Sequence, residues 1–426
     1  MALTLFGVLF IALFLGIPIA VSLGVAVLAA LFTQDTNTSY VMIAQRMFTS
    51  VDSFPLMAVP FFILAGNLME KGGISRRIIN FATVLLNKLP ASLSVITTAA
   101  SGFFGAISGS NPATVAAIGG LMIPGMIKKG YPNDNAAAVA AASGTLGVII
   151  PPSISMVTYG VVASVSIGAL FIAGIIPGLL LAIGIMLTGI FLNSKYENKS
   201  SSNVSAKQVY TVFKDAIWAL LMPVLILGGI YGGIFTPTES SAVACLYAFI
   251  VSKYIYRELK FSDLKSIFSQ SATSTALIMF VITLSAPFSW LMTSANVPTT
   301  LAESILATLN NKYVILLLIN FILLFLGCFL ETQSIILLMT PMLLPLAIQL
   351  GIDPVALGLI IIVNTSIGMI TPPMAVNLFV ASTISKVSIE QVSKKIIPYF
   401  VVELIILLVL TYFSGILTWL PNLLKL

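Results

Sequence analysis

Apolar runs of about 20 residues, separated by short polar or charged stretches, recur along nearly the whole chain. A helix of that length crosses about 30 Å of hydrocarbon, so the pattern predicts a bundle of membrane-spanning helices. We expect one long span over residues 3–33, a shorter one over residues 54–69 and a final one over residues 397–421. The pattern thus indicates an all-α polytopic membrane protein.

Two apolar runs are interrupted by the same device, a pair of adjacent prolines that follows a glycine. The first interruption is GTLGVIIPPS, residues 144–153, and the second is TSIGMITPPM, residues 365–374. Proline lacks a backbone N–H and clashes with the preceding turn, so each helix must break. Because a broken helix at membrane depth needs protein or a polar cavity around it, we expect two discontinuous helices, over residues 135–163 and 354–384.

The two interruptions belong to an internal repeat with an offset of 221 residues. This offset relates Gly147 to Gly368, Pro151 to Pro372 and Pro177 to Pro398, among other positions. Each interruption follows a long apolar stretch with a polar centre, over residues 91–127 and 312–348. Such a stretch is too long for one span, and we interpret it as a re-entrant hairpin with a polar tip.

Lysine placement indicates that the two repeats have opposite orientations. Lys128 and Lys129 follow the first hairpin, whereas the matching loop of the second half carries no cation. Conversely, Lys386 follows the second broken helix, and the matching loop of the first half is uncharged. Positive loops favour the cytoplasm, so alternating positive loops at equivalent places predict an inverted-topology repeat.

The predicted organisation is a first repeat over residues 1–194, a linker over 195–214 and a second repeat over 215–426. The linker carries four lysines among serines and asparagines, which places it in the cytoplasm. The N-terminus has no basic region and no evident cleavage site, so we expect a retained first helix. We also predict that the N-terminus lies in the cytoplasm.

Composition excludes several function classes. The chain is 58% hydrophobic and 8% charged, with a mean hydropathy of +1.09, which is far from the values of soluble proteins. The net charge of +6 comes from loop lysines and is a topology signal, so we expect no nucleic-acid partner. There is no histidine and no phosphate-binding glycine-rich loop with a GKS or GKT ending, and the two cysteines lie in apolar runs. We therefore expect no catalytic residue, no ATP hydrolysis and no enzyme.

Inverted repeats with discontinuous helices are typical of secondary transporters, whose ion and solute sites lie near the midplane. Backbone oxygens freed at a break suit a cation such as Na⁺. Few carboxylates lie in the spans, which favours Na⁺ over a proton as the coupling ion. The first predicted ion site contains Gly105, Ser108, Gly147, Ile150 and Pro152, and the second, by the repeat, contains Gly327, Gly368, Thr371 and Met374.

A bound organic acid would lie between the two hairpin tips. The candidate solute-binding residues are the polar groups of the tips and breaks: Ser110, Asn111, Thr114, Ser155, Glu331, Thr332 and Asn377. The alternative is that the serines and threonines only cap the hairpin helices. Glu331 is a costly carboxylate in an apolar pair of helices, which favours a role in solute binding over a loop position in a water-filled vestibule. It could accept hydrogen bonds from a polyhydroxylated solute, yet it would repel a nearby carboxylate.

Five stretches together resemble one transporter family over essentially the whole chain. They are FPLMAVPFFILAGNLMEKGGIS (residues 54–75), GAISGSNPATVAAIG (105–119), GTLGVIIPPS, FTPTES (235–240) and IGMITPPM. They resemble the large membrane subunit, of the DctM type, of the tripartite ATP-independent periplasmic (TRAP) transporters. That family belongs to the ion transporter superfamily, and the matched glycine, threonine and proline positions given above carry its ion sites. Gly368 stands where members commonly have a hydroxyl residue, which leaves that ligand to backbone oxygen.

The resemblance implies an elevator movement driven by a Na⁺ gradient in the bacterial inner membrane. It also implies two partners, a small membrane subunit that we expect on a separate chain and a periplasmic binding protein that delivers the solute. The expected solute is an organic acid such as a sialic acid or a C4-dicarboxylate. The alternative is a stand-alone Na⁺- or H⁺-coupled dicarboxylate or citrate symporter of the same superfamily, against which FTPTES and FPLMAVPFFILAG argue. A channel would lack a closed midplane site, and an intramembrane enzyme would need a nucleophile or metal cluster.

Overall fold

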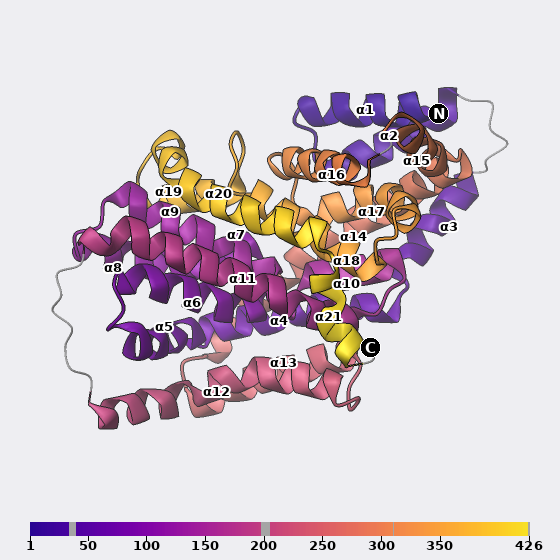
Figure 1. The fold of residues 1–426 in the computed structure, drawn as a ribbon. Coiled ribbons are helices and arrows are strands. Elements are labelled where there is room, and N and C mark those ends of the chain that lie inside the picture. Colours follow the sequence, from indigo (N-terminus) through magenta and orange to yellow (C-terminus); the bar gives the residue numbers. More distant parts are fainter. Residues whose placement is uncertain (34–39, 197–204, 310, 425–426) are drawn as a thin grey trace.

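The computed structural model describes residues 1–33, 40–196, 205–309 and 311–424, and every regular element within them is a helix (Figure 1). Five of the described helices are long and apolar enough to cross a membrane, and a sixth span is formed by two helices bent by 57°. The five are α11 (Ile167–Asn193), α12 (Ala206–Tyr231), α14 (Phe261–Ser294), α17 (Thr332–Gln349) and α20 (Ile389–Tyr412). The bent pair is α3 (Tyr40–Val51) with η1 (Phe54–Met57) and α4 (Ala58–Lys71). The prediction of an all-helical membrane protein is confirmed.

The first apolar run folds back on itself, which corrects the prediction of a single span over residues 3–33. It forms two short helices, α1 (Ala2–Phe14) and α2 (Ile19–Thr33), which pack against each other. Gly16 between them has a φ of +78°, a conformation that glycine adopts at little cost, and Pro18 cannot continue a helix from the preceding turn. The local break therefore overrides the apolar length of the run.

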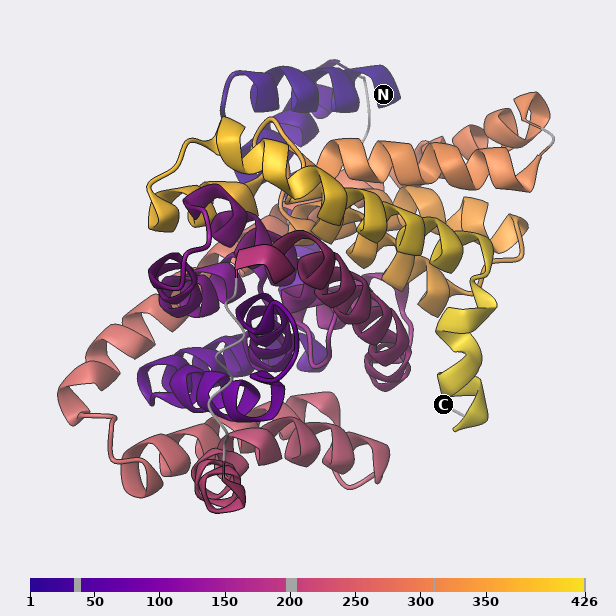
Figure 2. The same cartoon turned by 60° about the vertical axis from the view of Figure 1, so that its left-hand side comes forward.

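The outer part of the molecule is formed by α1–α5 and α12–α14. Among these helices, α5 covers Ile74–Leu86 and α13 covers Pro237–Ile250. In both views α12 and α13 form a layer on one side and α1 and α2 lie on the opposite side (Figures 1 and 2). The long helix α14 packs against α2, α3 and α4 and so connects these outer elements. Helix α12 begins at Ala206, inside the stretch interpreted as a linker, and residues 197–204 of that stretch lie outside the described residues.

One half-buried ion-pair cluster fastens α5 to α12. Arg77 on α5 lies 3.2 Å from Asp215 of α12 and 2.8 Å from Glu258, measured between side-chain nitrogen and carboxylate oxygen. Its guanidinium carbon stacks 3.7 Å from the ring centroid of Tyr256. Burial lowers the pKa of Arg77, but the hydrogen bonds to Glu258 and Asp215 outweigh that effect and leave the pKa raised. The outer helices are thereby held together at this end.

The inner part of the molecule contains the two hairpins. The first consists of α6 (Ser92–Ser108), the short α7 (Asn111–Thr114), a π-helical turn and α8 (Gly120–Lys128). The chain turns at Gly109, whose φ is +60°. The second hairpin consists of α16 (Lys312–Gly327) and α17, which begins one residue after Glu331. Both occupy the stretches in which the sequence predicts a polar tip between two apolar arms.

The two discontinuous helices are also present, as predicted. The first is α9 (Asn133–Ser143), a 3-10 turn over Gly144–Val148 and α10 (Ile154–Ala163). The second is α18 (Pro354–Gly368) and α19 (Val376–Ser385). The peptide bond between the two prolines is cis in both breaks. The inner part is completed by α11, α20 and α21 (Gly415–Leu423), which pack on the broken helices.

A tyrosine connects the two broken helices. The hydroxyl of Tyr159 on α10 donates a hydrogen bond to the carbonyl oxygen of Pro354 at 2.6 Å. Its ring packs on Gly358 of α18, where an added Cβ would clash with carbon atoms of the ring. We expect Tyr159→Phe to cost about 1 kcal/mol, the net value of one buried hydrogen bond, and to leave transport intact. Tyr210→Phe, at a tyrosine that is 67% exposed on α12, is the matched control. Thermal unfolding of the purified variants measures the difference, and equal midpoints would contradict this role of Tyr159.

Candidate functional site

In both halves, a glycine of the first hairpin arm packs on a glycine of the break. A Cβ added at Gly105 would lie 2.9 Å from the Cα of Gly147, and one added at Gly368 would lie 2.5 Å from the Cα of Gly327. Real Cβ atoms do not approach backbone so closely, so any larger residue would push the arm off the break. Four of the predicted ion-site residues therefore meet in two equivalent pairs.

Neutral oxygens gather at the first pair. The hydroxyl oxygens of Ser108 and Thr114 lie 3.0 Å apart, and the Thr114 hydroxyl donates to the carbonyl oxygen of Ser110 at 2.8 Å. A Cβ at Gly147 would lie only 2.5 Å from that carbonyl oxygen and 2.8 Å from the Thr114 hydroxyl. Hard cations take such hydroxyl and carbonyl oxygens as ligands, so this cluster fits Na⁺. Thr114, predicted as a solute contact, lies in the oxygen cluster and is fully buried.

The other two residues of the first predicted ion site lie at the end of the break. Pro152 is buried, and the Ile150 side chain packs between Gly102 of α6 and Gly178 of α11. An added Cβ would lie 3.0 Å from the Ile150 side chain at Gly102 and 2.7 Å from it at Gly178. These residues could offer a cation only their backbone oxygens, as the sequence predicts.

The second pair is surrounded mainly by backbone oxygen. A Cβ at Gly327 would lie 3.2 Å from the carbonyl oxygen of Thr365, and one at Gly368 would lie 3.1 Å from the carbonyl oxygen of Gly327. The Thr371 hydroxyl donates to the carbonyl oxygen of Ile367 at 3.0 Å. Met374 is 61% exposed at the edge of the break. The oxygen donors present fit a hard cation here too, with fewer side-chain hydroxyls than at the first break.

Asn111 connects the first hairpin tip to both breaks. Its side-chain amide donates to the hydroxyl of Ser366 on α18 at 2.7 Å, and its side-chain oxygen accepts from the backbone N–H of Val148 at 2.9 Å. Ser366 in turn donates to the carbonyl oxygen of Thr145 at 2.6 Å. Asn111, a predicted solute contact, is 0% exposed. Its side-chain amide hydrogen-bonds to both breaks and so connects the first and second halves of the chain.

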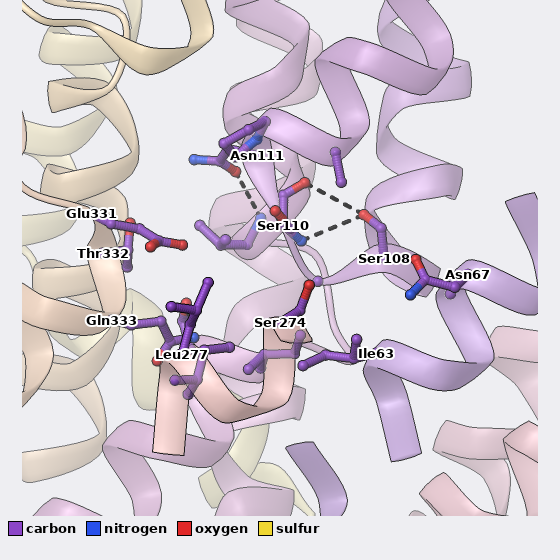
Figure 3. Close-up of a pocket in the computed structure, with 18 of the residues that line it drawn as sticks. Ile63, Asn67, Ser108, Ser110, Asn111, Ser274, Leu277, Glu331, Thr332 and Gln333 are labelled. Atoms are coloured by element: carbon purple, nitrogen blue, oxygen red, sulfur yellow. Dashed lines mark hydrogen bonds between the residues drawn. The ribbon is translucent and has the colours of Figure 1, made fainter. Parts of the chain in front are cut away.

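A cavity of about 250 Å³ lies between the hairpin tips (Figure 3). Of the predicted solute contacts, it is lined by Ser110, Asn111, Ser155, Glu331 and Thr332. In Figure 3, Glu331 and Thr332 face the cavity from one side, and Ser108 and Ser110 lie on the other. Asn377 is fully buried and does not line this cavity; its side-chain amide donates to the carbonyl oxygen of Ala141 at 3.4 Å.

The structure adds four polar residues to the cavity that sequence reasoning missed. They are Asn67 and Glu70 on α4, Ser274 on α14 and Gln333 on α17. The side-chain amide of Asn67 donates to the hydroxyl of Ser271 on α14 at 2.8 Å. Helices α4 and α14 therefore form one wall of the cavity together. The sequence did carry a signal for two of them. Asn67 and Glu70 are polar residues three positions apart in a largely apolar helix, so they lie on the same face of it.

The charge of the cavity wall is entirely acidic. Glu70 and Glu331 are the two ionisable side chains among the described lining residues, and none of those residues is a lysine or an arginine. An organic anion in this cavity would therefore need positive charge from elsewhere, and the adjacent oxygen clusters could supply it by holding cations.

A second, apolar cavity of about 690 Å³ lies behind the second hairpin tip. Its wall comes from the α1–α2 turn, α14, α16 and α17, and includes Phe14, Phe280 and Phe329. Glu331 and Gln333 line both cavities, so the tip of the second hairpin separates a polar compartment from an apolar one.

Paired hairpins and broken helices around a polar cavity define a helical membrane permease. The chain matches the family described as the tripartite ATP-independent periplasmic transporter, DctM component, over residues 6–416. It is 40% identical to the C4-dicarboxylate TRAP transporter large permease protein DctM of Rhodobacter capsulatus, covering 99% of both chains. The chain therefore belongs to the DctM family of TRAP transporter permeases, and the resemblance noted from its motifs is confirmed.

Other relatives have different solutes in their names. The chain is 44% identical to the isethionate TRAP transporter permease protein DctMQ of Oleidesulfovibrio alaskensis, over 97% of this chain and 65% of that protein, so it spans just under two thirds of that relative. It is 38% identical to the sialic acid TRAP transporter large permease protein SiaM of Vibrio cholerae, over 96% of both.

Two solved transporter structures share the fold. They are Neisseria gonorrhoeae MtrF, with a TM-score of 0.62 over 92% of both chains, and Alcanivorax borkumensis YdaH, with 0.61 over 87% of both. Sequence identities of 15% and 17% limit this likeness to the fold.

Proposed function

We propose that this chain is the large permease subunit of a transporter that couples the uptake of an organic acid to Na⁺ across the bacterial inner membrane. The observation that carries the proposal is the oxygen cluster of Ser108, Ser110 and Thr114, which lies at the hairpin tip that also lines the polar cavity. A site for a cation beside a site for an anion is the arrangement that coupling requires.

Na⁺, when bound, would supply the positive charge that the acidic cavity wall lacks. Ser108, Thr114 and the backbone around Gly105 and Gly147 would hold one ion, and the backbone around Gly327 and Gly368, with Thr371, would hold another. Because the hydroxyls of Ser108 and Thr114 hydrogen-bond to each other and to the tip backbone, a bound cation would reorganise the tip next to the solute. This couples the two binding events in a single stretch of chain.

Transport would occur by an elevator movement of the inner part against the outer part. The hairpins and broken helices form one connected unit through Asn111 and Ser366, whereas α1–α5 and α12–α14 pack mainly among themselves. A cavity with walls from both parts, as Asn67 and Ser110 show, would open differently as the parts slide.

The proposed partners are a small membrane subunit and a periplasmic substrate-binding protein, alongside the lipid bilayer. Membership of the family supports both partners. The names of the relatives, which include C4-dicarboxylate, isethionate and sialic acid, support an organic acid as the solute.

Uptake by the reconstituted transporter should depend on a Na⁺ gradient. We expect proteoliposomes that contain this chain and the small subunit, supplied with the binding protein, to accumulate a radiolabelled organic acid only when external Na⁺ exceeds internal Na⁺. Replacing Na⁺ with choline should reduce the initial rate at least tenfold, because the acidic wall then faces the anion without compensation, at a cost of about 1.4 kcal/mol or more. Rates are compared at constant ionic strength and pH.

Two results would contradict the proposal. Uptake that ignores Na⁺ and follows a pH gradient would remove the cation assignment. Full uptake in the absence of the binding protein would favour the stand-alone symporter of the same superfamily.

A further inference from the structure

The tip of the second hairpin carries two hydrogen-bond acceptors beside the cavity, on Glu331 and Gln333. The side-chain amide of Gln333 donates to the hydroxyl of Ser155 on α10 at 3.2 Å, which fixes the orientation of the side chain. Its side-chain oxygen then has no hydrogen-bond partner among the described residues, although Gln333 is only 6% exposed. A buried polar atom without a partner costs about 1–3 kcal/mol, so a donor that reached this oxygen would be strongly favoured.

Glu331 presents a second acceptor at the same tip. It occupies the N-cap position of α17, yet its carboxylate makes no capping hydrogen bond. Within the described part of the chain it forms no ion pair, and its side chain is exposed where it lines the cavities on either side of the tip. A carboxylate at membrane depth is costly unless a partner compensates it.

Among the described residues, no side chain donates a hydrogen bond to the carboxylate of Glu331 or to the side-chain oxygen of Gln333. Thr332 lies between the two acceptors in the sequence, and its hydroxyl donates to the sulfur of Met369 at 3.8 Å. The hydroxyl of Ser155 accepts from Gln333 and, within the described part of the chain, donates to neither acceptor. Of the described residues that line the cavity, none is a lysine or an arginine. A complementary ligand must therefore bring its own donors to this side.

We propose that the solute carries a hydrogen-bond donor, a hydroxyl or an ammonium group, in addition to its acid group, and that Glu331 and Gln333 accept from it. This inference rests on the proposed uptake of an organic acid and specifies the solute further. The acid group faces the first hairpin tip, where the oxygen cluster can hold a cation, because Glu331 repels an anion. The donor faces the second tip, so the two hairpins recognise opposite ends of one molecule.

The proposal makes a hydroxy or amino acid a better solute than the corresponding acid without that group. A site that hydrogen-bonds a polar group rejects an analogue that lacks it, because the acceptors are then left unpaired. A hydrogen bond to a charged acceptor accounts for a discrimination of about tenfold or more.

Two series of matched acids test this preference. The first is 3-hydroxypropionate, β-alanine and propionate, and the second is isethionate, taurine and ethanesulfonate. Within each series, the acid group at one end is the same, and the other end carries a hydroxyl, an ammonium group or only hydrogen. Na⁺-dependent uptake of each compound is measured as kcat/KM in proteoliposomes with the complete transporter. Calorimetry with the binding protein alone separates its own selectivity from that of the membrane subunits.

The variants are Glu331→Gln and Gln333→Leu, with Glu303→Gln as the matched control at an exposed acid on α15 (Val297–Thr308) outside the cavity. We expect the wild type to favour a hydroxy or amino acid at least tenfold over its unsubstituted analogue. Glu331→Gln and Gln333→Leu should each reduce this ratio to within about threefold by slowing the favoured acid, whereas Glu303→Gln should keep it. A larger loss for the amino acid than for the hydroxy acid in Glu331→Gln would identify an ammonium group as the donor.

The outcomes separate this inference from the function on which it rests. Uptake could depend on Na⁺ while neither Glu331→Gln nor Gln333→Leu changes the ratio of kcat/KM between the substituted and the unsubstituted acid. That result would overturn the inference and leave the proposed function standing. An unsubstituted acid that the wild type takes up as well as its hydroxy analogue would also overturn it. If none of the transported acids required Na⁺ for uptake, the proposed function itself would be contradicted. Assembly with the small subunit, checked for each variant, shows that a changed ratio does not result from misfolding.

Discussion

Gly147→Ala is expected to abolish most Na⁺-dependent uptake. The added Cβ would lie 2.5 Å from the carbonyl oxygen of Ser110 and 2.8 Å from the hydroxyl of Thr114, both in the oxygen cluster. Backbone cannot yield as a flexible side chain does, so the hairpin tip must shift away from the break. Overpacking costs about 1–3 kcal/mol, and at the upper end the initial rate would fall about a hundredfold. Uptake in proteoliposomes and its dependence on Na⁺ concentration measure the effect.

The matched control is Gly120→Ala in α8, the second arm of the same hairpin. A Cβ at Gly120 meets nothing within 4 Å. Alanine in a helix is about 0.5–1 kcal/mol more stable than glycine, so this variant should retain uptake and unfold at an equal or higher temperature. If Gly147→Ala bound Na⁺ with the affinity of the wild type, the oxygen cluster could not be the first ion site.

Asn111→Leu is expected to separate the two halves of the inner unit. The substitution removes the bond to Ser366 and leaves the backbone N–H of Val148 without its acceptor in a fully buried position. An unsatisfied buried donor costs about 1–3 kcal/mol, and the lost bond to Ser366 adds about 1 kcal/mol. We expect a lower midpoint of thermal unfolding and a strong loss of uptake, because the tip no longer holds its place beside the cavity.

Two further variants calibrate this result. Ser366→Ala removes the bond from Asn111 and the bond to the carbonyl oxygen of Thr145, but it leaves the buried Val148 N–H paired, so it should have a smaller effect than Asn111→Leu. Asn422→Leu, at an exposed asparagine on α21, should leave both stability and uptake unchanged. An unchanged unfolding midpoint in Asn111→Leu would show that the connection between the tip and the two breaks adds no stability.

The broken helices could be predicted because proline and glycine act through their own backbone. Pro151 and Pro152 end a helix in any surroundings, and the offset to Pro372 identified the second break without any tertiary information. Gly105 and Gly147 were predicted in one ion site from the first hairpin and the first break, and the repeat extended this prediction to Gly327 and Gly368. The structure brings the two glycines of each pair together. The repeat could supply this information because equivalent positions in two copies of one motif have equivalent neighbours.

The first apolar run shows where the pattern misled. Its length predicted one span over residues 3–33, but the positive φ of Gly16 and the proline two residues later divide it into two helices that pack side by side. The length of an apolar segment shows whether it could span a membrane as a single helix. Whether the helix continues through a local break depends on how the segment packs against its neighbours.

Sequence alone determined the helical membrane class, the two broken helices, the repeat and Glu331 as an unusual carboxylate. Only the tertiary structure decided which polar groups line the cavity. It brought Asn67 and Ser274 there from α4 and α14, buried Thr114 and Asn377 away from it, and left the side-chain oxygen of Gln333 buried without a partner among the described residues. The physical reason is one of range. Proline, glycine and charge act on the chain next to them, whereas a cavity wall is formed by residues far apart in sequence, whose meeting depends on how helices pack.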